Sequence, residues 1–322
     1  MSIDLTKFTR LPTLPTVAVR LLQRFADPDV NLASITEILR PDPALTASVL
    51  RAAGSVEFGV GRPLSDLGRA IGMLGARRVT SLVLCFTLSE DSMKPGPLAA
   101  LYRDVWLRSV ILAITAELLA RRRARALEAE HFTAGLLADI GRLAMLKSHP
   151  DEYCIVADQI RHDPQRADDL ERAAFGLTHS DLAVALFRNW RLPAEFSEAV
   201  RLRNASLADL QSQPSGESRP LVHGIAVATA VGSMFCDACK GAAFDRVSDL
   251  ARTLYGMTAD ESDDFLGAVR ERVGACAGIL RANTSLLGSA EEVMAEARRQ
   301  LERQIGDSSD AMAVPDLAES AG

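Results

Sequence analysis

The chain has 322 residues, of which 48% are hydrophobic, 24% charged and 5% aromatic. These proportions are typical of a globular protein and exclude a disordered, collagen-like or coiled-coil chain, and the length allows one large domain or two smaller ones. The 36 Lys and Arg residues against 42 Asp and Glu residues give a net charge of −6. This charge disfavours sequence-independent binding to nucleic acid, so we expect no nucleic-acid partner.

The cysteine content and the N-terminal residues both bear on location. An odd and sparse set of cysteines favours a reducing compartment over a disulfide-rich secreted domain; it consists of Cys85, Cys154, Cys236, Cys239 and Cys276. Residues 1–12 contain charged side chains and no apolar signal-peptide region. The longest uncharged stretch, residues 220–236, is short for a bilayer span. We therefore expect a cytoplasmic protein without a membrane partner.

Helical spacing of apolar residues begins near the N-terminus and recurs along most of the chain. Stripes of this kind lie within residues 17–25, 32–39 and 64–74. Asp42 precedes Pro43, an arrangement that favours a helix start with a capping carboxylate and proline in the first position. Residues 79–88 have a β-like composition, but no second alternating run offers a partner strand. The sequence therefore predicts an all-α fold.

After residue 88 the sequence predicts longer helices, two breaks and a C-terminal tail. We expect helices over residues 98–120 and 128–147, and a loop over residues 89–97. Residues 210–220 (LQSQPSGESRP) are polar and contain Pro and Gly, as is typical of a linker. From residue 305 onward the chain lacks periodicity and is predicted to be disordered.

Several motifs occur in a defined order along the chain. They are LPTLP (11–15), LRPDPALTASVLRAAGSVEFG (39–59), LSDLGRAIGMLGARRVTSLVL (64–84), VWLRSVILA (105–113), AGLLADIGRLAML (134–146) and ERAAFGLTHSDLAVALFRNWRLP (171–193). This ordered set resembles the HDOD family, the HD-related output domain of bacterial signalling proteins. The resemblance implies an HD-like helical domain preceded by an N-terminal helical subdomain, with further helices after a linker.

The resemblance also implies a domain plan. The HDOD-like all-α domain would span residues 8–205, and residues 206–220 would form a linker or loop. Residues 221–304 would form C-terminal helices that pack on the domain or extend it, and residues 305–322 a disordered tail. The groove between the helices of residues 10–85 and those of residues 100–205 would carry the contact with a partner or ligand.

HD-domain phosphohydrolases, to which this family is related, hold divalent metals with a His, a His-Asp pair and a later Asp. The resemblance places these four positions on Arg108, Ala138, Asp139 and Thr229, and an additional His pair of some members near Arg203 and Asn204. Arginine is a fixed cation that does not coordinate metal, and one carboxylate cannot replace the hydration shell of an ion with useful affinity. We therefore expect a vestigial site with no metal, no cofactor and no catalytic residue.

Four residues mark a candidate cleft for a ligand or a partner: Asp139, His179, Arg108 and Trp190. His179 matches a histidine common in the family, and a lone His at a helix start is usually a hydrogen-bonding or capping residue. For Asp139 we expect either capping of a helix or pairing with an arginine.

The densest basic run is a second candidate surface, formed by Arg121, Arg122, Arg123 and Arg125. Arginines at the end of a long helix favour the negative end of its dipole, and such a terminus is usually only solvated. The functional interpretation is a docking patch for an acidic partner or a nucleotide phosphate.

These observations favour a non-enzymatic output or adaptor module of bacterial signal transduction. It would act by binding signalling proteins or a small ligand, with a nucleotide second messenger as one candidate. The alternative is a divergent metal-dependent HD phosphohydrolase or phosphodiesterase, in which Asp139 and His179 recruit Glu130, His131 or Asp181. A third hypothesis, nucleic-acid regulation through the arginine run, conflicts with the net negative charge.

Overall fold

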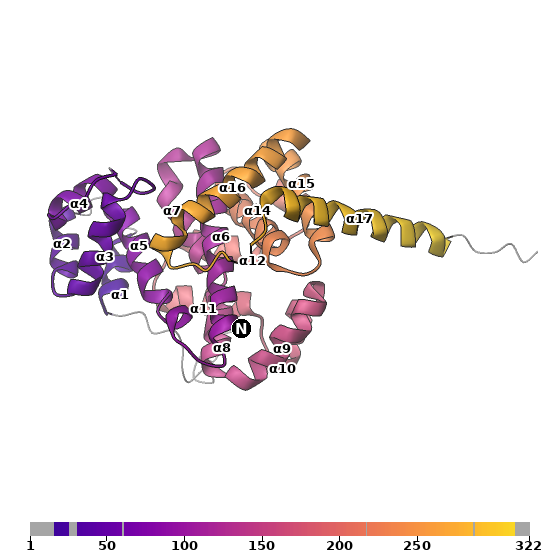
Figure 1. Ribbon diagram of the computed structural model, residues 1–322, viewed down its shortest axis with the longest axis horizontal. Helices are drawn as coiled ribbons and strands as arrows, with labels where there is room; N and C mark the ends of the chain where they lie inside the picture. Colours follow the sequence, from indigo (N-terminus) through magenta and orange to yellow (C-terminus); the bar gives the residue numbers. More distant parts are fainter. Residues whose placement is uncertain (1–15, 26–30, 60, 217, 286, 313–322) are drawn as a thin grey trace, which may run out of the picture.

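A computed structural model of the chain describes residues 16–25, 31–59, 61–216, 218–285 and 287–312 (Figure 1). Within these ranges the regular structure is helical and contains no strand, which confirms the predicted all-α class. The LPTLP motif at residues 11–15 lies outside the described residues.

The N-terminal helices pack at one end of the molecule (Figure 1). They are α1 (Thr16–Phe25), α2 (Leu32–Leu39), α3 (Pro43–Gly54), α4 (Leu67–Leu74) and α5 (Ala76–Leu88). The Asp42 carboxylate accepts hydrogen bonds from the amides of Ala44 and Leu45, so it caps α3 as predicted. The β-like stretch 79–88 belongs to α5 and is buried at almost every position. A helix buried on all sides is apolar throughout, which explains why the composition resembled that of a strand.

The central part of the chain forms the HD-like core. It contains α6 (Ala99–Arg123), α7 (Glu128–Leu137), α8 (Ile140–Ser148), α9 (Pro150–His162), α10 (Ala167–Phe175), α11 (His179–Asn189) and α12 (Ala194–Arg201), with short 3-10 turns at Asp91–Met93, Arg125–Leu127 and Pro164–Arg166. The single helix predicted over residues 128–147 is therefore two helices. The break at Ala138 and Asp139 places the Asp139 side chain inside the core, where it is 0% exposed.

Helices α8 and α11 contact each other through their backbones. A Cβ atom on Gly141 would lie 1.9 Å from the carbonyl oxygen of His179. Only glycine allows this approach, because any side chain at position 141 would overlap that carbonyl. The contact holds the α7–α8 break against the start of α11, and so brings Asp139 close to His179.

The C-terminal helices pack on this core. They are α13 (Leu207–Gln211), α14 (Arg219–Cys236), α15 (Lys240–Tyr255), α16 (Ala259–Leu280) and α17 (Ala290–Met312). The expected linker contains α13, whose Leu210 is fully buried, whereas the other described residues of this segment are exposed or half-buried. Helix α17 projects from the body (Figure 1) and continues to Met312, so residues 305–312 are helical where disorder was expected. Residues 313–322 lie outside the described residues.

Helix α14 is long and apolar enough to cross a membrane, contrary to the expectation from its length, but 78% of it is buried inside the protein. It packs against α6 and α15. The α4–α5 pair would meet the same criterion together, although the two helices are bent by 107° at their junction. The packing of α14 in the core accounts for its apolar sequence.

Candidate functional site

The centre of the candidate site is the buried carboxylate of Asp139. Its Oδ2 accepts a hydrogen bond of 2.9 Å from Nε of Arg108, and its Oδ1 lies 2.7 Å from Nη1 of Arg203. Nε of Arg142 lies 3.9 Å from the same Oδ1. Burial by itself raises the pKa of a carboxyl group, but the guanidinium groups of Arg203, Arg108 and Arg142 outweigh it and hold the pKa of Asp139 well below its ordinary value. Asp139 is therefore an ionised partner of arginines, as one of the two expectations proposed.

Arg108 connects three elements through one planar group. Besides Asp139, it donates to Oδ1 of Asp237 at 2.9 Å and to Oγ of Ser233 at 2.8 Å. Its side chain is only 7% exposed. Because the guanidinium has a rigid fork of donors, these bonds tie α6 to the α7–α8 break and to the C-terminal end of α14.

Arg203 completes the cluster from the loop that follows α12. Its Nη1 donates to the carbonyl of Ala138 at 2.9 Å, and its Nε donates to Oγ1 of Thr229 at 3.2 Å. The side chain is 2% exposed. The structure thus brings together all four positions at which the resemblance places the metal ligands, Thr229 included.

The residues at these positions do not fit a divalent metal ion. Arg108 occupies the place of the first histidine, and Ala138 offers no side-chain donor. Both oxygens of Asp139 already face guanidinium groups. The fixed positive charges of Arg108, Arg142 and Arg203 would repel a cation at this point.

His179 begins α11 and is held by a buried acid on α10. Its backbone amide and its Nδ1 both lie 2.7 Å from Oε2 of Glu171. Burial raises the pKa of Glu171, but the interactions with His179 and Arg142 lower it by more, so the pKa lies below its ordinary value. The carboxylate therefore accepts both hydrogen bonds. The cap of α11 is Thr178, which forms a capping box with Asp181. Of the two expected roles, His179 therefore performs hydrogen bonding rather than capping.

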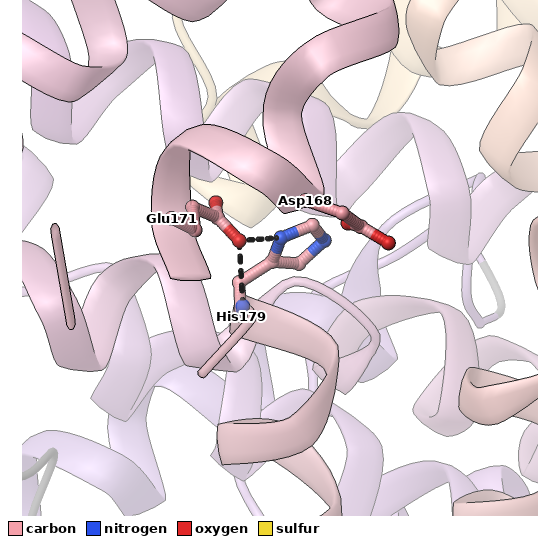
Figure 2. A group of neighbouring side chains, drawn as sticks. All are labelled: Asp168, Glu171 and His179. Carbon is pink, nitrogen blue, oxygen red and sulfur yellow. Dashed lines mark hydrogen bonds and ion pairs between the residues drawn. The ribbon is translucent and has the colours of Figure 1, made fainter. Parts of the chain in front are cut away.

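Asp168 joins Glu171 and His179 in a group that sequence reasoning missed. One potential ligand atom from each residue lies within 4.8 Å of the others. In Figure 2 the imidazole of His179 stands between the two acids, with Glu171 at its Nδ1 and Asp168 on the opposite side. The i, i+3 spacing of Asp168 and Glu171 is the signal that places both acids on one face of α10.

The additional ligands proposed for a divergent hydrolase are used elsewhere. Glu130 pairs with Arg77 on α5, and Nδ1 of His131 lies 2.9 Å from the Leu127 carbonyl. Asp181 belongs to the capping box of α11. None of the three joins Asp139.

Two adjoining cavities lie over the Asp139 cluster. The first, which we call the arginine lobe, has a volume of about 360 Å³ and is lined by Arg108, Arg142, Ile160, Pro164, Gln165, Ala167, Asp168, His179, Arg203, Asn204, Thr229, Ser233, Asp237 and Arg246. The second, the apolar lobe, has a volume of about 470 Å³. Trp190, which we expected in the cleft, lines neither cavity. Its side chain packs into the hydrophobic core at the C-terminal end of α11.

The basic run is exposed, but most of its guanidinium groups have partners. Arg121 bonds to Glu117 and Glu128, at 3.1 and 3.0 Å. Arg122 and Arg123 lie over aromatic rings, 5.7 Å from the centroid of Phe265 and 5.4 Å from that of Tyr255. The side chain of Arg125 is 88% exposed, with Glu128 3.8 Å away. Arg121, Arg122 and Arg123 therefore already contact acidic or aromatic side chains, whereas the side chain of Arg125 is largely exposed. These contacts weaken the case for a docking patch.

The helical core, and the buried acid that pairs with arginines at the α7–α8 break, define an HD-related helical domain. The model of the HDOD domain family matches residues 11–206. The chain belongs to the HDOD family.

Solved structures share this fold. An HDOD domain protein of unknown function from Geobacter sulfurreducens is 21% identical with a TM-score of 0.63, covering 88% of this chain and 98% of that one. A candidate signal transduction protein from Marinobacter aquaeolei is 20% identical with a TM-score of 0.61, covering 84% of this chain and 60% of that one. A candidate metal-dependent phosphohydrolase from Shewanella amazonensis is 18% identical with a TM-score of 0.59, covering 86% and 96%.

A curated relative also matches. An uncharacterized protein of Treponema pallidum is 24% identical over 226 residues, which are 68% of this chain. The match spans 41% of the length of that relative.

Proposed function

We propose that this HDOD protein is a non-enzymatic module of signal transduction that acts through binding. The observation that carries this proposal is the pairing of the buried Asp139 with the guanidinium groups of Arg108 and Arg203, where the resemblance would lead us to expect metal ligands. Metal-dependent phosphohydrolases use the ion to generate a nucleophile from water and to stabilise the charge on the phosphoryl oxygens. Fixed cations can hold an anion, but they cannot lower the pKa of a coordinated water.

The test is the metal content of the full chain after incubation with manganese, iron or zinc, measured by elemental mass spectrometry. We expect less than about a tenth of an equivalent per chain, because a site needs several convergent donors. One or two equivalents that disappear in Asp139→Asn would contradict the proposal. Phosphodiesterase activity that depended on this metal would then identify an enzyme.

A divergent hydrolase is the second candidate, and the Asp168, Glu171 and His179 group is the observation in its favour. In that case the bound metal would survive Asp139→Asn and disappear in Asp168→Asn. Asp168 is only partly buried, so its substitution leaves the core intact. The matched control is Asp169→Asn, which changes an acid exposed on the same helix but outside the group.

A further inference from the structure

We propose that the two lobes together bind an amphipathic organic phosphate, with the phosphate in the arginine lobe and an apolar or aromatic body in the apolar lobe. The inference rests on the proposed function, because it assigns the former metal site to an anion held without metal.

The arginine lobe contains two guanidinium groups, those of Arg142 and Arg246, with few strong acceptors among the described residues. Nε of Arg142 is buried without a hydrogen bond within the described part of the chain, and its nearest carboxylate is the shared Asp139, 3.9 Å away. Arg246 donates to the carbonyl of Ala205 at 2.8 Å and forms no ion pair with the described residues. A phosphate oxygen would supply the acceptors that these two side chains lack.

Repulsion between the arginines also favours an anion. Arg108, Arg142 and Arg203 converge on one carboxylate, Asp139, and Arg246 lines the same lobe. Among the described residues, the other acids lining the lobe are Asp237, which is bound by Arg108, and the half-buried Asp168. Asp168 would repel a polyphosphate, so the lobe suits a phosphate with one or two negative charges.

The apolar lobe offers a complementary environment. Its apolar lining consists of Leu101, Val105, Leu107, Tyr153, Ala157, Ile160, Phe235 and Leu287. Arg108, Arg142, Ile160 and Asp237 line both cavities, so the lobes meet at these residues. Ligand sites typically have a volume of about 300–1,000 Å³, and the volume of each lobe falls within this range. Charged side chains of Asp104, Arg161 and Lys240 also line the apolar lobe, beside its apolar residues. A molecule that places a phosphate at Arg142 can therefore extend its body over Ile160.

The experiment measures binding of AMP, adenosine and inorganic phosphate to the full chain by isothermal titration calorimetry in buffer with EDTA. We expect AMP to bind at least tenfold more tightly than adenosine or phosphate, because each of these fills only one lobe. Arg246→Gln should weaken AMP about tenfold, since a charge-assisted hydrogen bond is lost. Arg246 is half-buried, and its replacement leaves the Asp139 cluster unchanged. Arg125→Gln, which removes an exposed arginine outside both lobes, should leave the affinity unchanged.

Three outcomes overturn the inference. If none of the probes binds up to about 5 mM, the lobes hold no organic phosphate at a useful affinity. Equal weakening in the Arg246 and Arg125 variants would place the phosphate outside the arginine lobe. AMP binding that appears only after manganese is added would overturn the proposed function as well. If the protein binds neither AMP nor metal, this inference is wrong but the proposed function stands.

Discussion

Two polar regions of the protein differ in how their buried ionisable groups are stabilised. Around Asp139, charged groups are retained and paired with one another. The second region surrounds a cavity of about 610 Å³, lined by Arg123, Arg219, Tyr255 and the two histidines His131 and His223, among others. Burial lowers the pKa of both histidines, although the carbonyls of Leu127 and Leu210 oppose it. The comparison shows that the core retains charge around Asp139, where compensating groups are built in, and that burial disfavours the charged form of the two histidines.

The largest effect should come from breaking the charged region. Asp139→Ala leaves three arginines facing one another without their common carboxylate, and we expect the free energy of unfolding to fall by about 3–5 kcal/mol. Urea denaturation followed by circular dichroism measures this change. The matched control is Asp249→Ala, which removes an exposed pair with Arg252 and should cost less than about 1 kcal/mol. Similar losses of unfolding free energy in the two variants would show that the buried Asp139 cluster contributes no more to stability than an exposed ion pair.

A second substitution tests the backbone contact between α8 and α11 without changing any charged group of the Asp139 region. Gly141→Ala puts a methyl group into the His179 carbonyl, so we expect a loss of about 1–3 kcal/mol or more and an altered environment of His179 in NMR spectra. Gly267→Ala in α16 meets no atom within 4 Å and should stabilise the helix by up to about 1 kcal/mol. A neutral result at position 141 would contradict the close approach of α8 and α11.

The smallest effect concerns the neutral region and its pH dependence. The folded-state pKa of His131 is lowered, so below its unfolded value of about 6.5 the unfolded chain binds more protons than the folded one. Its contribution to stability is therefore complete above about pH 6.5 and is lost as the pH falls toward the lowered pKa, with a slope of up to about 1.4 kcal/mol per pH unit. Asp139, whose folded-state pKa is lowered from an ordinary value near 4, loses its contribution only below about pH 4.

Urea denaturation at pH 5, 6 and 7 tests this difference between the regions. His131→Phe should reduce the slope of stability against pH between pH 5 and 7. An unchanged slope in His131→Phe would mean that this histidine does not titrate differently in the folded and unfolded states.

Local patterns in the sequence predicted the local features of the fold. Apolar periodicity identified the helices, and the Asp42–Pro43 pair identified a cap that the structure contains. The break before α8 was not predicted, because residues 138–139 contain neither Gly nor Pro. The site was predicted in part, since Arg108, Asp139 and His179 do meet.

The rest of the site depends on packing between distant segments. The Arg108–Asp237 bond joins residues 129 positions apart, and Arg203 reaches Ala138 across 65 positions. No local pattern specifies such pairs. Trp190 was placed in the cleft on the motif alone, but only the packed structure shows that its ring turns into the core.

The mutual dependence of Asp139 and its arginines has an evolutionary consequence. Replacing Arg108 by histidine would supply one potential metal ligand, yet it would leave Asp237 without its cation and Arg203 still paired with Asp139. Recovery of a metal centre therefore requires several replacements, of which the first ones reduce stability without a gain in chemistry. Under the proposed function, the paired arginines therefore oppose stepwise evolution toward a metal centre.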